Sequence, residues 1–181
     1  MMHNSKKQLK CPISGIKLPN FCQFRFFFNK SCDKIQKRSG KMKDITIKVI
    51  STQASKGKNP LITELITEGN FYMDDGQYCF EYIESEISGM EGSVTRLISD
   101  GDKKLTMKRN GVQASALLEF QEGEKSKSSY ITEYGTFAII LNTTKVESTI
   151  DQFGRGKINL EYRMTFGTDS ETINKLEITI R

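Results

Sequence analysis

Apolar and polar side chains alternate with a period of two along most of the chain after residue 42. In residues 77–83 the aromatic side chains occupy every second position, and residues 158–166 show the same alternation. Successive side chains of a β-strand point to opposite faces, so each run predicts a strand with one apolar face. No apolar stripe with helical spacing competes with this pattern in residues 77–111. The pattern therefore predicts an all-β fold.

Short turns separate the predicted strands. Asp100-Gly101 and Asn110-Gly111 tolerate the positive φ angles of tight hairpins, so the strands around them follow one another as a meander. About ten such strands follow Met42, and none of the intervening segments is convincingly helical.

Two segments leave the element boundaries open. Residues 61–68 repeat every four positions, which a short helix could also use, but Thr63, Thr67 and Gly69 favour a strand with a bulge. Further along, one apolar alternation covers residues 137–141 and another begins at residue 144, so two separate strands are predicted there.

Many short antiparallel strands with one apolar face must pack as two sheets or curl into a barrel. Closure removes the exposed strand edges, and about eight or more strands leave an interior that side chains or a ligand can occupy. The chain also ends on a strand that can pair with an early one. We therefore expect an antiparallel up-and-down β-barrel of about eight to ten strands rather than a sandwich.

Charge divides the chain into a leader and a domain. Residues 1–41 contain ten Lys and Arg and one acidic residue, Asp33, whereas residues 42–181 contain 17 basic and 21 acidic residues. The domain is mildly acidic, so its charge gives no reason to expect nucleic acid as a partner. We expect residues 42–181 to form one domain and residues 1–41 to be a basic, disordered leader, although a basic arm for RNA or membrane surfaces is an alternative.

The leader lacks the features of a targeting or metal-binding segment. Its apolar run, residues 21–28, is too short for a membrane span and has no signal-peptide cleavage site. The cysteines at 11, 22 and 32 lack the close pairs of a zinc site. Residues 37–39 can be encoded by a purine-rich ribosome-binding sequence, so we expect translation to start at Met42, which an intact mass of the native protein would test.

Composition excludes several chemistries from residues 42–181. This segment has no histidine and one cysteine, Cys79, which excludes histidine-based catalytic triads, histidine-ligated metals and an intrachain disulfide. No glycine-rich phosphate loop is present. We expect no metal site and no cofactor.

Two groups of residues are candidates for a binding site. Arginines on an inward face need an anionic partner, either Glu81 or Glu84 of the chain itself or the acid group of a ligand. The first group combines aromatic and arginine residues that could share the interior: Tyr78, Tyr82, Arg96, Arg109 and Tyr162. The second group is a loop expected at the barrel mouth: Glu84, Glu86, Gly89, Met90, Glu91 and Gly92.

The run ESEISGMEGSVTRL at residues 84–97 resembles the signature of the YwiB-like family, bacterial proteins that carry a domain of unknown function. Residues 69–72, 107–111, 134–137 and 156–166 extend the resemblance from about Met42 to Arg181. It implies a calycin-type barrel, similar to lipocalins and fatty-acid-binding proteins, in a cytoplasmic protein. It implies no catalytic residues, and the chain has no Trp to match the Gly-x-Trp motif of lipocalins.

Three functions remain open on these grounds. The first is a barrel that binds a small amphipathic or acidic ligand in its interior without catalysis. The second is a structural or protein-interaction module with a filled core, present as a monomer or homodimer. The third is an enzyme that uses Glu and Tyr side chains.

Overall fold

A computed structural model of the chain describes residues 41–181, except for 102, 112–113, 133 and 168–169. The expectations for the leader, residues 1–41, lie outside the described residues except at Lys41. No helix in the described part of the chain is long and apolar enough to cross a membrane.

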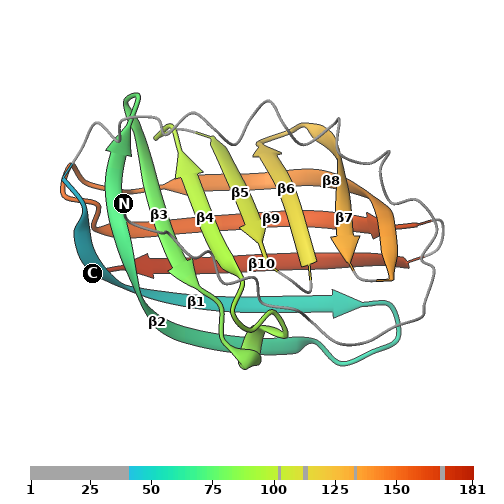
Figure 1. The fold of residues 1–181 in the computed structure, drawn as a ribbon. Helices are drawn as coiled ribbons and strands as arrows, with labels where there is room; N and C mark the ends of the chain where they lie inside the picture. The colour runs from blue at the N-terminus through green and yellow to red at the C-terminus, as the bar shows by residue number, and fades with distance from the viewer. Residues whose placement is uncertain (1–40, 102, 112–113, 133, 168–169) are drawn as a thin grey trace, which may run out of the picture. The chain divides into compact units, whose positions relative to one another are not determined.

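Ten antiparallel strands close into a barrel in which neighbours along the chain are also neighbours in the sheet (Figure 1). This confirms the predicted all-β, up-and-down barrel. A short 3₁₀ helix, η1 (Glu86–Ser88), follows the third strand. The strands are β1 (Lys43–Ser55), β2 (Leu61–Asp74), β3 (Gln77–Ile83), β4 (Val94–Ser99), β5 (Lys104–Asn110), β6 (Ala114–Gln121), β7 (Lys125–Thr132), β8 (Gly135–Ser148), β9 (Gly156–Phe166) and β10 (Ser170–Ile180).

The first and last strands join to close the sheet. β1 pairs with β2 on one side and with β10 on the other, where Ile47 lies opposite Ile180. Just beyond this pair, Thr46 and Arg181 exchange two backbone hydrogen bonds of 3.0 Å. Figure 1 shows β1 lying beside β10. No strand edge is left between β1 and β10 to pair with another chain.

The alternation of the sequence becomes the inside and the outside of the barrel. In β9, Ile158 and Leu160 are buried in the interior, whereas Lys157 is exposed on the outer face. Leu160 lies opposite Leu176 of β10, so apolar side chains from neighbouring strands meet in one core.

Two predicted details differ from the structure. The runs around residues 137–141 and 144–150 belong to a single strand, β8, because a bulge between Thr143 and Lys145 shifts the register by one residue. The bulge expected in β2 is absent: Gly69 lies in regular register with Ile45 and Tyr82. A Cβ at Gly69 would clash with the Glu81 carbonyl oxygen, so the glycine allows close packing rather than a bulge.

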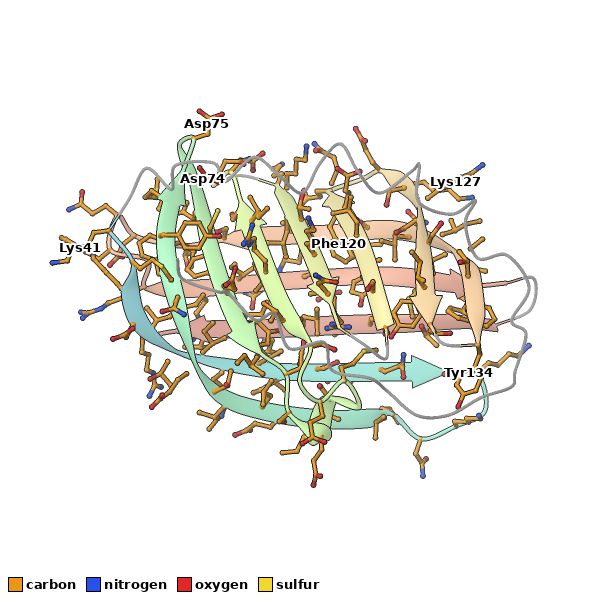
Figure 2. The ribbon with its side chains drawn as sticks, in the orientation of Figure 1. Lys41, Asp74, Asp75, Phe120, Lys127 and Tyr134 are labelled. Carbon is orange, nitrogen blue, oxygen red and sulfur yellow. The ribbon has the colours of Figure 1, made fainter. Side chains whose placement is uncertain are left out.

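The two ends of the barrel differ in packing. At the closed end, which carries the turns at 75–76 and 149–155, aromatic rings fill the interior, with Phe71 and Phe80 centroids 5.4 Å apart. At the open end, which carries the turn at 56–60 and the loop at 84–93, the interior is hollow. Figure 2 labels Asp75 at the closed end and Tyr134 at the open end.

The junction between β6 and β7 is the shortest in the barrel wall. Among the described residues, three residue pairs connect these strands, and the last of them joins Ala116 and Tyr130. Beyond them, the Ser126 hydroxyl donates to the Glu119 carbonyl oxygen at 2.7 Å, and the Ser128 hydroxyl donates to the Leu117 carbonyl oxygen. Serine side chains therefore bridge the strands where the backbone ladder stops.

Candidate functional site

The hollow end of the barrel contains a cavity of about 570 Å³. Its wall is mainly apolar and comes from nine of the ten strands and from the loop at 84–93. The apolar side chains that line it are Val49, Leu61, Leu65, Ile87, Met90, Met107, Leu118, Ile139, Met164, Phe166, Leu176 and Ile178.

The cavity exists because inward positions change character along single strands. β1 places Ile45 and Ile47 inward near the closed end, and Ser51 and Gln53 inward near the open end. β10 likewise changes from large apolar residues to Asn174. Shorter and polar side chains do not fill the barrel axis, so space remains at the open end.

A buried polar cluster lies on one wall of the cavity. Arg109 of β5 donates from Nη2 to Glu84 Oε1 at 2.9 Å and from Nε to Thr95 Oγ1 at 3.2 Å. Thr95 in turn donates to Glu84 Oε1 at 2.7 Å. The Glu84 side chain is only 3% exposed and that of Arg109 18%. Pairing with Arg109 and Thr95 compensates the burial of the carboxylate.

Two tyrosines extend this cluster into the cavity. Burial raises the pKa of Tyr82, and the neighbouring Glu84 carboxylate raises it further. Burial also raises the pKa of Tyr162 to about 12, although Arg109 acts in the opposite direction. The Tyr162 ring packs against Phe120 with a centroid distance of 4.8 Å. Both hydroxyls therefore stay protonated at neutral pH and can donate hydrogen bonds.

A second polar group, which sequence reasoning missed, lies on the β1 and β10 side of the cavity. Gln53 Nε2 donates to Asn174 Oδ1 at 3.2 Å, and Asn174 Nδ2 donates to Thr172 Oγ1 at 2.9 Å. The signal that could have found them is a polar residue on the inward parity of an otherwise apolar strand. Gln53 follows Val49 and Ser51 on one face, and Asn174 precedes Leu176.

The loop at 84–93 covers part of the open end. It is held by the Glu84 amide, which donates to the Ser93 carbonyl oxygen at 2.8 Å. Gly89 ends η1 with φ 69°, a left-handed conformation that favours glycine. Beyond it, the Tyr130 hydroxyl contacts Met90 Sδ at 3.1 Å, which fixes the loop against β7.

Comparison with known proteins assigns the family. Residues 47–178 match the family described as Domain of unknown function (DUF1934). The chain belongs to the DUF1934 family. No curated protein matches it.

A solved structure supports the fold of this DUF1934 chain. It is similar to the crystal structure of the ywiB protein from Bacillus subtilis, with a TM-score of 0.63 and 18% sequence identity. The likeness covers 80% of this chain and 97% of the other. The resemblance to the YwiB-like family is thereby confirmed. At 18% identity, the similarity between the two structures shows a shared fold.

The DUF1934 barrel brings most of the predicted site residues together. Both tyrosines of the polar cluster and Arg109 lie in the cavity wall, as do Glu84, Glu86, Gly89 and Met90 of the loop. Glu91 and Gly92 belong to the same loop but do not line the cavity. Tyr78 points inward nearer the closed end, where its ring stacks on that of Phe71 with a centroid distance of 6.1 Å. Tyr78 therefore does not line the cavity either.

Arg96 lies on the outer face of the barrel. Its Nη2 donates to Glu81 Oε2 at 2.7 Å, and its guanidinium lies 5.8 Å from the centre of the Tyr72 ring. Of the two internal partners considered from sequence, Glu81 pairs with Arg96 outside the barrel and Glu84 pairs with Arg109 inside it.

The described residues offer little for nucleophilic or metal chemistry. Burial raises the pKa of Cys79, and the nearby Asp74 carboxylate raises it further, whereas a reactive thiol needs a lowered pKa. Among these residues no group of three or more His, Cys, Asp or Glu side chains is arranged to hold a metal ion.

Proposed function

We propose that this protein binds a small amphipathic or acidic molecule in the cavity at the open end of the barrel and catalyses no reaction on it. The observation that carries the proposal is the cavity itself. Its volume of about 570 Å³ falls in the range of known ligand sites. An apolar wall with a few converging polar groups suits a molecule with an apolar body and a polar head.

A binding role fits the polar groups better than a catalytic one. The Glu84 carboxylate accepts hydrogen bonds from Arg109 and Thr95, which compensates its charge. Tyrosine hydroxyls are protonated near neutral pH, and burial raises the pKa of Tyr82 and of Tyr162 further, so neither is a strong nucleophile or base. These groups can orient a bound molecule by hydrogen bonding.

Native mass spectrometry of the gently purified protein tests the proposal directly, because a bound molecule adds its mass to the chain. A fluorescent amphipathic dye, anilinonaphthalene sulfonate, provides a second measurement. Leu118→Trp places a larger side chain into the cavity wall, whereas Leu117→Trp changes a neighbouring residue that is 50% exposed on the outer face. We expect Leu118→Trp to weaken dye binding by about ten-fold or more and Leu117→Trp to leave it unchanged.

The two variants are a matched pair because the natural chain contains no Trp, so each carries one fluorescent reporter of its own fold. Emission at short wavelength from Leu118→Trp, with an unchanged circular dichroism spectrum, would show that the barrel remains folded. Equal dye affinity of the two folded variants, together with no added mass on the natural protein, would overturn the proposal.

A protein-interaction module is the second candidate, and one observation favours it. Large apolar side chains are exposed at the open end: Leu61 is 60% exposed, Ile62 65% and Ile87 58%. Exposed apolar groups of this kind suit a protein partner or a homodimer. Light scattering that gives a dimer mass, combined with a failure of both ligand tests, would favour this candidate.

We propose the cytoplasm as the compartment of this protein. Cys79 is buried with a free thiol, and it is the one cysteine of residues 42–181. A domain that uses no disulfide suits a reducing compartment. Fractionation of the native host with an antibody to the barrel would test this.

A further inference from the structure

The ion pair inside the cavity bears on the charge of the ligand. Glu84 follows β3 and Arg109 lies near the end of β5, and both line the cavity. Their side chains are 3% and 18% exposed and are joined by a hydrogen bond of 2.9 Å. Thr95 bonds to both of them and holds the pair in place.

In this ion pair the Glu84 carboxylate neutralises the positive charge of Arg109, which an acidic ligand would need as its partner. The carboxylate of Glu84 already balances Arg109, and the other charged side chain that the described residues contribute to the cavity wall is Glu86, which is negative. A ligand carboxylate beside Arg109 would lose its hydration and lie close to the charge of Glu84. A neutral head group avoids both penalties.

The polar group on the other wall is also uncharged. Gln53 and Asn174 line the same cavity and bond to each other at 3.2 Å. Amide side chains both donate and accept hydrogen bonds. The ion pair offers the same combination, because guanidinium N–H groups donate and carboxylate oxygens accept.

We propose that the ligand has an apolar body and an uncharged head that both donates and accepts hydrogen bonds, as an alcohol or a primary amide does, rather than a carboxylate. This rests on the proposed function, namely that the cavity binds an amphipathic molecule. It selects among the ligand classes that the function allows.

The test compares three molecules with the same saturated chain and different heads: decanol, decanamide and decanoate. Each competes with Nile red, an uncharged dye, for binding to the full-length protein at about pH 7. We expect decanol and decanamide each to bind at least about ten-fold more tightly than decanoate does.

Glu84→Gln keeps the shape of the side chain, removes its charge and leaves the Arg109 guanidinium unbalanced. We expect this variant to bind decanoate about ten-fold more tightly than the natural protein does. Glu81→Gln is the matched control, because it removes the partner of Arg96 from an ion pair on the outer face. It should leave all three affinities unchanged.

The outcomes separate this inference from the function on which it rests. If decanoate binds the natural protein as tightly as decanol, the inference is wrong and the binding function stands. If Nile red binds but none of the three molecules displaces it, the inference is wrong and the binding function stands. If Nile red does not bind either and the natural protein carries no added mass, the function fails and the inference fails with it. Should Glu84→Gln not fold, as judged by circular dichroism, the order of affinities in the natural protein decides the matter alone.

Discussion

At the scale of single residues, two glycines share a backbone conformation and differ in their surroundings. Gly123 and Gly154 both have φ 80°, in the left-handed region. A Cβ at Gly123 would meet nothing within 4 Å, whereas a Cβ at Gly154 would overlap the ring of Phe71. Gly154 lies in the turn that covers the closed end of the barrel. Substituting each glycine in turn therefore distinguishes the cost of backbone strain, which both share, from the cost of steric overlap, which only Gly154 has.

We expect Gly123→Ala to lower the free energy of unfolding by about 1–2 kcal/mol, the cost of a left-handed alanine. Gly154→Ala should cost about 1–3 kcal/mol more, because the core must also shift around the added methyl group. Urea denaturation of both variants measures the difference. Equal losses of stability would show that the turn does not pack tightly on Phe71.

Tyr162 links stability to alkaline pH. Its pKa is raised from 10.0 to about 12 in the folded protein, so between these values the unfolded chain loses a proton that the folded chain keeps. The stabilisation from Tyr162 is complete below pH ~10 and is lost as the pH rises toward ~12. We expect the free energy of unfolding to fall over this interval by up to about 2–3 kcal/mol more in the natural protein than in Tyr162→Phe.

Denaturation curves at several alkaline pH values, with ultraviolet absorbance to count tyrosinate, provide the measurement. Tyr82, whose pKa is also raised, is present in both proteins and cancels in the comparison. Parallel pH profiles of the natural protein and the variant would contradict the prediction.

The residue scale also shows where sequence reasoning reached its limit. Alternation placed Tyr82, Arg109 and Tyr162 on inward faces, and the structure has them in the cavity wall. Alternation could not decide for Arg96, because apolar residues occupy both faces of β4. The pairing of Arg96 with Glu81 depends on the register of β3 and β4, which no local pattern specifies.

At the scale of elements, the β6–β7 junction makes a prediction of its own. Ser126 and Ser128 bond to carbonyl oxygens of β6 where the ladder has stopped, while Ser129 points to the outer face. We expect the double change Ser126→Ala and Ser128→Ala to lower the free energy of unfolding by about 1–2 kcal/mol, since a hydrogen bond that water can replace contributes about 0.5–1 kcal/mol.

Hydrogen exchange would locate the effect, because amides of β6 and β7 should exchange faster in the double variant than in the natural protein. Ser129→Ala is the control, since the Ser129 side chain is exposed on the outer face of the same strand. If the control and the double variant are equally stable, the serine bridges do not contribute to holding the junction.

The elements themselves were largely predictable, and their boundaries less so. Hairpin turns such as Asp100-Gly101 and the alternation between them locate most strands. The bulge in β8 was read as the end of one strand and the start of another, because an extra residue reverses the parity of everything after it. Only the pairing with β9 shows that the strand continues.

At the scale of the whole molecule, the barrel should respond unequally to added volume. Val49 lines the cavity at the open end, whereas Val146 is 2% exposed in the packed interior and does not line the cavity. We expect Val146→Leu to lower the free energy of unfolding by about 1–3 kcal/mol through overpacking. Val49→Leu should change it by less than about 0.5 kcal/mol, since the extra methylene enters open space.

Both variants make the same chemical change, so urea denaturation compares the two ends directly. Equal destabilisation by Val49→Leu and Val146→Leu would mean that the open end is packed as tightly as the closed end. That result would also weaken the case for a bound molecule.

The all-β class of the fold was predictable from the alternation, and the barrel was preferred over a sandwich because closure removes the exposed strand edges. The cavity was not, because its size depends on how side chains from opposite strands share the barrel axis. Gln53 and Asn174 lie 121 residues apart in the chain, and only the closed sheet brings them together.

The joining of β1 to β10 has a consequence for protein synthesis. β1 leaves the ribosome before the strand with which it pairs. Ile180 emerges some 130 residues after its partner Ile47, and Arg181 follows Thr46 by a similar number of residues. During that interval the growing chain carries a strand edge without its neighbour. We therefore expect the barrel to close slowly and the growing chain to need chaperones until β10 has emerged.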